Sequence, residues 1–336
     1  MKILVAGGVF RHSAEELAKR EPAPEVVLVD GLRRRGIEVR ACRLEDRGTV
    51  ALARESDIVH VHHLSKAAVL AALSPLARPF VFTAHRFALP PTPLQRRAQR
   101  MVMSRATAVV CLSQVEAEQT TSRYRLPRSR VEVIPNGIGI SSDVCRPRRL
   151  APDGQIILLF VGQLIAMKQI HRVIEALPDL PRQVVLRLVY HNDELECRLR
   201  ERARALGLLD RVTFVGQRSG PELVEEYRRA HLLVLPSELG YECLPSVVTE
   251  GLLTGLPVVA SEVGGVPDQV RDAGVLVSPS SSVSLAPAIT TVLQAYEHFA
   301  NRALARARTA ANDYSVDHMI DRHLDLYQRL MQKGEM

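Results

Sequence analysis

Two glutamates, Glu242 and Glu250, stand eight positions apart in the segment YECLPSVVTEGLLTGLPVVAS, residues 241–261. A strand is expected to end at Pro236-Ser237, which places Glu242 in the loop between that strand and the helix that follows. A helix N-terminus carries unpaired N–H groups and a partial positive charge, which together bind anions. Carboxylates accept hydrogen bonds from hydroxyl groups. The pattern therefore suits a ligand with hydroxyls on both sides of a phosphate. The alternative is a helix-dipole charge at Glu242 and a solvated helix residue at Glu250.

The residues between the glutamates predict how this helix begins and ends. Pro245 is suited to the first helical position, and the hydroxyl of Ser246 can help to cap the helix. Glu250 then falls about one turn into the helix, and Gly255 ends it.

The segment belongs to a chain of 336 residues, of which 46% are hydrophobic and 4% aromatic. That length favours two domains, and the composition is that of a globular protein. The five cysteines are scattered without metal-ligand spacing, and the first residues lack the features of a signal peptide. Both observations predict a cytoplasmic protein with reduced thiols. The net charge of +7 favours anionic partners such as nucleotides or phosphorylated sugars.

Short apolar runs alternate with helix-sized segments, which is typical of parallel sheets covered on both faces. The runs of the first half are residues 2–6, 37–44, 57–62, 79–85, 107–113 and 131–137. Those of the second half are 155–162, 184–190, 211–216, 231–237, 256–261 and 274–279. We therefore expect an α/β protein with two doubly wound, Rossmann-like domains facing across a cleft. In such sheets ligands bind at the carboxyl ends of the strands.

A polar, basic segment with two prolines separates the two series and predicts the linker. The expected boundaries are an N-terminal domain over 1–140, a linker over 141–154, a C-terminal domain over 155–311 and a terminal helix over 312–336. A return of that helix onto the N-terminal domain is one option.

The E-x7-E segment and its surroundings resemble the retaining glycosyltransferases of the GT-B fold, in particular family 4. VGGVPD, residues 263–268, follows the segment as in that family. Upstream, VIPNGI (133–138), FVGQLIAMK (160–168) and the stretch 211–237 agree with the same family in the same order. The resemblance implies a GT-B enzyme whose C-terminal domain holds a nucleotide-sugar donor and whose N-terminal domain holds the acceptor.

The resemblance assigns roles to individual positions. Glu242 matches the glutamate that contacts hydroxyls of the donor sugar, and Glu250 matches the one that binds the nucleotide ribose. Lys168 matches the lysine that grips the donor diphosphate beyond the turn at Gly162. Gln163, however, stands where the family usually has an arginine. This departure removes one fixed positive charge from the expected donor site.

Other donor contacts follow from the same resemblance. Backbone N–H groups after Glu242 are expected to meet the phosphate, namely those of Cys243, Leu244, Ser246 and Val247. Gln217 and Arg218, just past a strand end, are placed to meet the base, and a UDP-sugar is favoured over a GDP-sugar. Arg218 and Arg172 are also candidates to replace the missing charge.

Candidate residues of the N-terminal domain also lie at strand ends. Gly7 and Gly8 end the first strand and let the backbone approach an acceptor closely, and Arg11 is a candidate contact for an acceptor phosphate. AGGVFRH does not fit the G-x-G-x-x-G dinucleotide fingerprint. His85 ends the fourth strand, and its family counterpart contacts the donor sugar and supports the transition state. With Lys168 and Glu242 it completes the expected catalytic set.

His60, His62 and His63 lie together in IVHVHHL, and two of them share one strand face, which raises the hypothesis of a metal site. The resemblance opposes it, since such strand ends occur in the family without a metal. The chain also has no D-x-D motif. We expect neither metal nor cofactor, with Lys168 and the helix N-terminus in place of a cation.

The acceptor is left open as a sugar, a lipid-linked molecule or a small molecule. The segment PTPLQRRAQRMVMSR, residues 91–105, is either a basic helix on an acidic membrane surface or an ordinary helix packed on the sheet. The spread of the charge and the absence of a recognition motif argue against nucleic acid. The expected location is the cytoplasm, with peripheral contact at the inner face of the membrane as the alternative.

The resemblance implies a same-face transfer in which the leaving phosphate takes the proton of the acceptor hydroxyl and the anomeric configuration is retained. Two other functions remain open. One is an isomerase of the same fold, similar to a UDP-sugar 2-epimerase. The other is a non-catalytic nucleotide-sugar binding subunit, which the Gln163 departure keeps in view.

Overall fold

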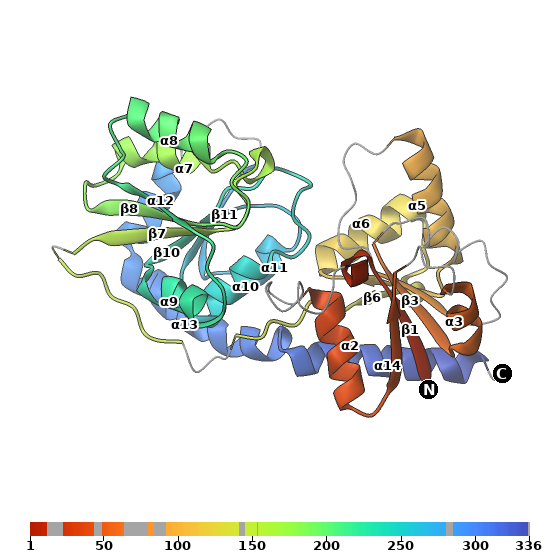
Figure 1. Ribbon diagram of the computed structural model, residues 1–336. Coiled ribbons are helices and arrows are strands. Elements are labelled where there is room, and N and C mark those ends of the chain that lie inside the picture. The colour runs from red at the N-terminus through yellow and green to blue at the C-terminus, as the bar shows by residue number, and fades with distance from the viewer. Residues whose placement is uncertain are drawn as a thin grey trace. The chain divides into compact units, whose positions relative to one another are not determined.

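A computed structural model describes residues 1–11, 23–43, 49–63, 79–83, 92–140, 145–152, 154–279 and 285–334. The chain divides into two compact units (Figure 1). Unit 1 consists of Met1–Gly137 and Tyr314–Met336, and unit 2 of Ile138–Asp313. The C-terminal segment is therefore part of the same unit as the N-terminal half.

Unit 1 holds a parallel sheet in the order β2-β1-β3-β4-β5-β6. Its strands are β1 (Lys2–Ala6), β2 (Glu38–Cys42), β3 (Ile58–His62), β4 (Phe80–Thr83), β5 (Ala108–Cys111) and β6 (Val131–Val133). The helices are η1 (Gly8–Arg11), α2 (Pro24–Arg34), α3 (Thr49–Glu55), α5 (Pro93–Arg105), α6 (Gln114–Tyr124), η2 (Arg128–Arg130) and α14 (Val316–Gly334). Each predicted strand of the first half is confirmed.

Unit 2 holds a second parallel sheet in the order β12-β11-β10-β7-β8-β9. Its strands are β7 (Ile156–Val161), β8 (Val184–Val189), β9 (Val212–Gly216), β10 (Leu232–Leu235), β11 (Val258–Ser261) and β12 (Gly274–Val277). The helices are η4 (Ala166–Lys168), α7 (His171–Ala176), η5 (Leu177–Asp179), α8 (Glu196–Ala205), α9 (Gly220–Arg229), α10 (Ser246–Leu253), α11 (Val266–Val270), α12 (Ala286–Gln294) and α13 (Tyr296–Asp313). The strands predicted for the second half are confirmed as well.

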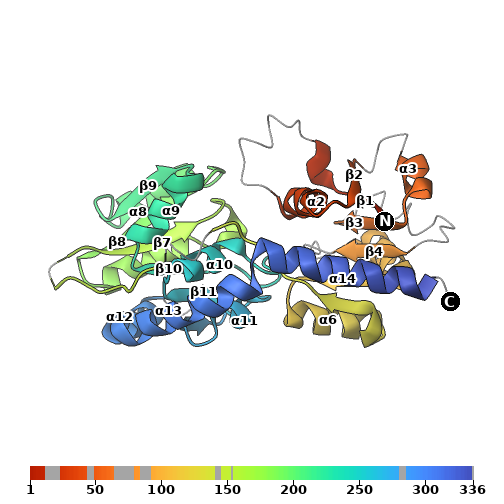
Figure 2. The ribbon, with the colours of Figure 1, turned by 90° about the horizontal axis from the view of Figure 1, so that it is seen from below.

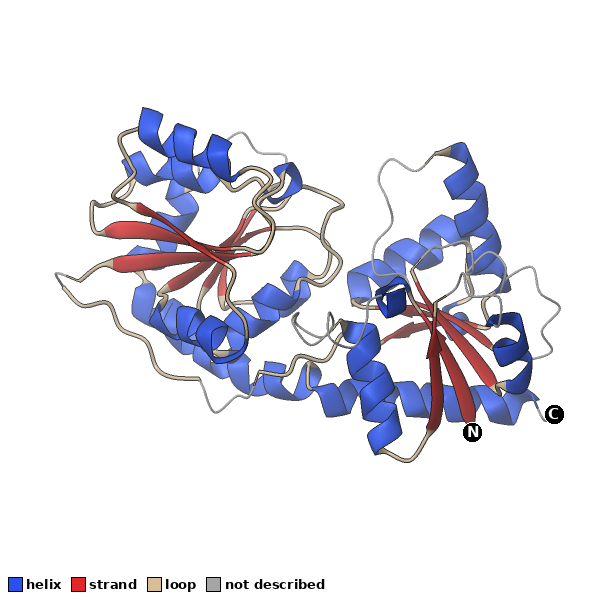
Figure 3. Cartoon of the chain, viewed as in Figure 1, coloured by secondary structure: helices blue, strands red, loops and turns tan. Residues whose placement is uncertain are grey.

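Helices cover both faces of each sheet (Figure 3). In unit 1, side chains of α3, α5 and α6 form one apolar cluster with the strands, and those of α2 and α14 form another. The four residues of β10, LLVL, are all buried, as are those of β11. A strand buried on both faces cannot alternate polar and apolar residues, which is why the apolar runs of the sequence are continuous.

The strand order reverses direction once in each sheet. In unit 2 the chain runs from β7 outward to β8 and β9, and then returns to the other side of β7 to form β10, β11 and β12. Ligands of open α/β sheets bind where the order reverses, because the two loops there turn away in opposite directions. In unit 2 this place lies at the carboxyl ends of β7 and β10.

The terminal helix α14 packs against α2 within unit 1 (Figure 2). Ile320 and Tyr327 of α14 are buried in the same cluster as Leu28 of α2. At the crossing, a Cβ on Gly31 would lie 1.9 Å from the Cδ1 atom of Ile320. Gly31 is therefore required by the close approach of the two helices.

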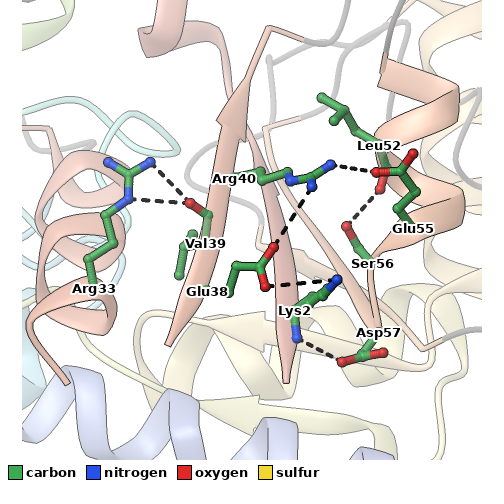
Figure 4. A network of polar contacts seen from close by, with 9 residues as sticks. All are labelled: Lys2, Arg33, Glu38, Val39, Arg40, Leu52, Glu55, Ser56 and Asp57. Carbon is green, nitrogen blue, oxygen red and sulfur yellow. Dashed lines mark hydrogen bonds and ion pairs between the residues drawn. The ribbon is translucent and has the colours of Figure 1, made fainter. Parts of the chain in front are cut away.

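Polar contacts fix the amino ends of the strands in unit 1 (Figure 4). The backbone N–H of Lys2 donates to Asp57 at 2.7 Å, and Arg40 donates to Glu55 at 2.6 Å. Arg33 reaches from α2 to the carbonyl oxygen of Val39, which ties the edge strand β2 to the helix. Since these contacts gather near the strand starts, they belong to the structural edge of the sheet and not to its ligand-binding edge.

Arg148 attaches the predicted linker to unit 2. Its guanidinium donates to the carbonyl oxygens of Tyr227, Arg228 and Thr254 at 2.9–3.0 Å, and also to that of Ala230. These carbonyls lie at the ends of α9 and α10, where a cation is favoured. Burial lowers the pKa of Arg148. The described residues 145–152 are thus held against unit 2, and the division between the units falls at residue 137.

Three histidines are buried where β3 meets α14. His60 lies between the hydroxyls of Tyr327, 2.6 Å from Nδ1, and Thr83, 2.7 Å from Nε2. The rings of His62 and His323 lie 4.3 and 5.5 Å from the His60 ring, centroid to centroid. Burial lowers the pKa of His323 to about 4, from an ordinary value of 6.5.

Acid is therefore expected to destabilise unit 1 through His323. Above about pH 6.5 the ring is neutral in both states, and its contribution is fully present. As the pH falls toward 4, His323 is protonated in the unfolded chain but stays neutral in the folded chain. The free energy of unfolding therefore drops by up to about 3 kcal/mol. Denaturant titrations at neutral pH and near pH 5 should show a smaller drop for His323→Leu than for the native chain. His298→Leu, at an exposed position of α13, is the matched control, and an equal drop in all three proteins would contradict the assignment.

Candidate functional site

The loops that follow β7 and β10 bring Lys168 and Glu242 into contact. Lys168 Nζ lies 2.6 Å from Glu242 Oε1, although the residues are 74 positions apart. Their side chains are only 9% and 8% exposed. The hydroxyl of Ser237, which is fully buried, donates to the same oxygen at 2.6 Å. The ring of Tyr241 lies over the lysine, 5.1 Å from Nζ to its centroid.

Backbone geometry holds the two loops in place. Gly162 has φ +155°, and a Cβ there would lie 3.2 Å from the Phe160 ring and 3.6 Å from Lys168 Cε. The N–H of Glu238 donates to the carbonyl of Met167 at 2.8 Å, which joins the loop after β10 to the loop after β7. The ion pair is thus held in place by the surrounding backbone and differs from a surface contact between two mobile side chains.

Gly264, which follows β11, supports the loop of Glu242 from the other side. Its φ is +51°, and a Cβ would lie 2.2 Å from the carbonyl oxygen of Glu242 and 2.8 Å from that of Cys243. The neighbouring Gly265 donates its N–H to the carbonyl of Cys243 at 2.6 Å. Gly264 of VGGVPD is therefore required by close backbone contact, whereas Gly265 contributes a backbone hydrogen bond.

Glu250 is buried and hydrogen-bonded. It is 5% exposed, and the hydroxyl of Tyr227 donates to its Oε2 at 2.6 Å. The reading of Glu250 as a solvated helix residue is therefore wrong. Tyr227 is on α9 and fully buried, and sequence reasoning missed it because nothing local marks it as a partner of the glutamate.

The expected helix between the glutamates is present, but its first turn differs from the prediction. Pro245 has an extended backbone and is the N-cap residue, while Ser246 is already helical. A capping side chain must come from the extended residue before the helix. The expectation that Ser246 caps α10 is therefore wrong. Gly255, with φ +77°, ends the helix as predicted.

Cys243, Leu244, Ser246 and Val247 lie around the N-terminus of this helix, as predicted. Leu244 is buried, whereas Cys243 and Val247 are half-buried and Ser246 is exposed. Their backbone amides lie at the N-terminal end of α10, a helix of eight residues, and in the loop that also carries Glu242.

Gln163 joins the site through its side-chain amide. Its Nε2 lies 3.2 Å from Nε2 of His191, and the hydroxyl of Tyr241 lies 3.5 Å from its Oε1. His191 follows β8, the neighbour of β7 in the sheet. His191 was not predicted from the sequence; a polar residue two positions after a buried strand was the available signal.

Gln217 and Arg218 follow β9, the edge strand, two places from β7 in the sheet. Arg218 donates to the carbonyl of Gln217 at 2.8 Å and lies 3.8 Å from Glu222. In the described part of the chain, no hydrogen bond or ion pair joins either residue to Lys168. The structure therefore does not bring them into the same cluster.

In unit 1, Gly7 and Gly8 follow β1 as predicted, at the reversal of the strand order between β1 and β3. A Cβ on Gly8 would meet nothing within 4 Å, and one on Gly7 would make only ordinary contacts. The turn itself therefore does not demand either glycine. The side chain of Arg11 and the whole of His85 lie outside the described residues.

Within the described ranges, no group of three or more His, Cys, Asp or Glu side chains is placed to hold a metal ion. Both ring nitrogens of His60 lie against hydroxyls. His63, with φ +66°, pairs with Glu25 at 2.9 Å. The imidazoles of His60 and His63 are thus engaged within unit 1.

Within the basic segment 91–105, Pro93–Arg105 form α5, which begins with a capping box between Thr92 and Gln95. Val102 and Met103 are fully buried in a core cluster of unit 1. These contacts favour the ordinary packed helix over the membrane-surface helix. None of the described helices is both long and apolar enough to cross a membrane.

Comparison with protein families gives two matches. The model described as glycosyl transferases group 1 matches residues 142–309, and that of glycosyltransferase family 4 matches residues 43–141. Among curated relatives, the D-inositol 3-phosphate glycosyltransferase of Mycolicibacterium smegmatis is 32% identical over 302 residues, or 82% of this chain and 68% of the relative. That of Mycobacterium avium is 31% identical over 306 residues, covering 82% and 70%.

Solved structures agree on the fold. Anabaena HepE in complex with UDP has a TM-score of 0.78 at 21% identity, over 98% of this chain and all of that one. Sucrose-phosphate synthase from Thermosynechococcus elongatus has a TM-score of 0.76 at 20% identity, over 99% of this chain and all of that one. At such low identity the likeness establishes the fold alone.

Proposed function

This chain belongs to the glycosyl transferases group 1 and has the GT-B fold, and on that premise we propose that it is a retaining, metal-independent enzyme that moves a sugar from a nucleotide-sugar donor to an acceptor hydroxyl. A UDP-sugar is the favoured donor and a GDP-sugar the second choice. Solved neighbours that contain UDP and UDP-glucose support this order.

The observation that carries the proposal is the ion pair of Lys168 and Glu242 where the strand order reverses. An ammonium group next to a helix N-terminus can hold a diphosphate, and a carboxylate beside it can hold sugar hydroxyls. The two residues are partners in the free protein. Donor binding then replaces one internal ion pair by two ligand contacts, a phosphate on Lys168 and hydroxyls on Glu242.

Glu250 is proposed to hold the ribose. Tyr227 donates to one of its oxygens at 2.6 Å and so fixes the plane of the carboxylate. A carboxylate held in this way can accept hydrogen bonds from two neighbouring hydroxyls without losing side-chain entropy at the moment of binding.

The proposed reaction breaks the bond between the anomeric carbon and the diphosphate oxygen. Lys168 and the N–H groups at the start of α10 stabilise the negative charge that grows on that oxygen. The acceptor hydroxyl attacks on the same face, and its proton passes to the departing phosphate. In this proposal, Lys168 and these N–H groups stabilise the departing diphosphate in the way that a divalent cation does in metal-dependent enzymes.

The relatives carry the name D-inositol 3-phosphate glycosyltransferase, which supports a small phosphorylated polyol as the acceptor over a glycan or a lipid-linked molecule. Gly7, Gly8, Arg11 and His85 keep their proposed roles as acceptor and sugar contacts. The packed state of α5 gives no support to a membrane-bound acceptor.

The decisive test is binding and slow hydrolysis across UDP-, GDP-, ADP- and dTDP-sugars, with chelator present. We expect one UDP-sugar to bind and to release UDP slowly, and transfer to appear when inositol 3-phosphate is added. Epimerised sugar without release of nucleotide would indicate the isomerase. Binding without turnover under any acceptor would indicate a non-catalytic subunit, and an absolute need for a divalent cation would overturn the metal-independent mechanism.

A further inference from the structure

A second polar group stands beside the Lys168–Glu242 pair. Four side chains form a series of contacts there. The Tyr241 ring lies over Lys168, the Tyr241 hydroxyl faces Gln163 Oε1, and Gln163 Nε2 faces His191. Gln163 follows β7 and His191 follows β8, so both emerge from the carboxyl ends of paired parallel strands.

The contacts of Gln163 define the state of the imidazole. With Oε1 toward the hydroxyl of Tyr241, the amide nitrogen of Gln163 faces His191 Nε2 and donates to it. An imidazole nitrogen that accepts a hydrogen bond carries no proton, so the proton of the neutral ring is on Nδ1. His191 is exposed and makes no other side-chain hydrogen bond to the described residues. Its Nδ1–H group is therefore a donor that Gln163 orients and solvent reaches.

The charge at the site shows what such a donor can bind. The positive charge of Lys168 is matched by Glu242, so this pair is neutral as a unit. A nucleoside diphosphate brings more than one negative charge and several acceptor oxygens. An oriented N–H group at the next strand end supplies a further contact without an opposing carboxylate of its own.

We propose that His191 is a diphosphate-binding residue of the donor site and that Gln163 is the residue that positions it. This inference rests on the proposed nucleotide-sugar donor and names a contact that the site uses in addition to Lys168. The acceptor of the hydrogen bond is a phosphate oxygen of the nucleotide, and the donor is Nδ1–H of the neutral imidazole.

Titration calorimetry with UDP and with uridine tests the proposal on the full chain. His191→Ala should weaken UDP about tenfold, the value of one hydrogen bond to a charged acceptor, and leave uridine unchanged. His191→Asn should restore most of the affinity, because its amide nitrogen replaces Nδ1. Gln163→Ala should weaken UDP to a similar or smaller extent, and adding it to His191→Ala should cost nothing further. His298→Ala is the matched control for loss of an exposed histidine of unit 2.

Three results would overturn the inference while the proposed function stands. These are unchanged UDP affinity in His191→Ala, equal losses for UDP and uridine, or additive losses in the double variant. If the native chain binds no UDP but binds another nucleoside diphosphate, the same variants are measured with that probe. Failure of the native chain to bind any nucleoside diphosphate would overturn the proposed function and the inference together.

Discussion

Replacing Lys168 with methionine is expected to lower kcat/KM for sugar transfer by about 10²- to 10³-fold, the usual cost of removing one preorganised group that stabilises developing negative charge. Methionine keeps the length and apolar stem of lysine but not the ammonium group. Since Lys168 would stabilise the departing phosphate more than the bound donor, the loss should be largest in kcat. Steady-state kinetics with the donor found in the binding panel provide the measurement.

The same variant should also be less stable, and this effect must be separated from catalysis. Without Lys168, the carboxylate of Glu242 remains nearly buried, and among the described residues Ser237 is its remaining hydrogen-bond partner. Breaking a buried pair on one side costs about 3 kcal/mol. The double variant Lys168→Met/Glu242→Gln removes both charges and should regain most of the free energy of unfolding. Its activity should stay lost. Recovery of activity in the double variant, or full activity in Lys168→Met, would refute the assigned role.

Replacing Glu242 with glutamine is expected to have opposite effects on product binding and on turnover. UDP should bind at least severalfold tighter, because the charge of Lys168 is no longer matched in the free protein. Turnover should fall by about 10²-fold, because the hydroxyl contacts of the donor sugar weaken and the internal partner of Lys168 changes. Calorimetry with UDP and single-turnover kinetics separate the two effects.

Ser237→Ala is the control for Glu242→Gln. It removes a hydrogen bond of 2.6 Å to the same oxygen but leaves both charges in place. We expect UDP affinity close to that of the native chain and a smaller loss of turnover. If UDP binds Glu242→Gln more weakly than it binds the native chain, the two residues do not compete for partners in the free site, and the proposed exchange of contacts fails.

The two-sheet architecture could be predicted from local sequence patterns. The inner strands of a parallel sheet between two helical layers, such as β10 and β11, are buried on both faces, and this burial requires the continuous apolar runs seen in the sequence. The turn before Glu242, the helix that follows it and its end at Gly255 are also local features, set by proline and glycine chemistry. Gly255 ends the helix as predicted, whereas Pro245 is the extended N-cap and not the first helical residue, and Ser246 does not cap the helix.

Which of these local features come into contact depends on the order of the strands in the folded sheets. Lys168 and Glu242 touch because β10 lies beside β7 and not beside β9, which it follows in the chain. Glu250 is buried by Tyr227 of α9, and Gln163 faces His191 because β8 lies on the other side of β7. The strand order depends on the total apolar surface that the whole sheet buries against its helices. This total cannot be inferred from any single segment of the sequence. Lys168, Glu242, Glu250 and Gln163 could therefore be proposed from the sequence, while their contacts with one another and with Tyr227 and His191 could not.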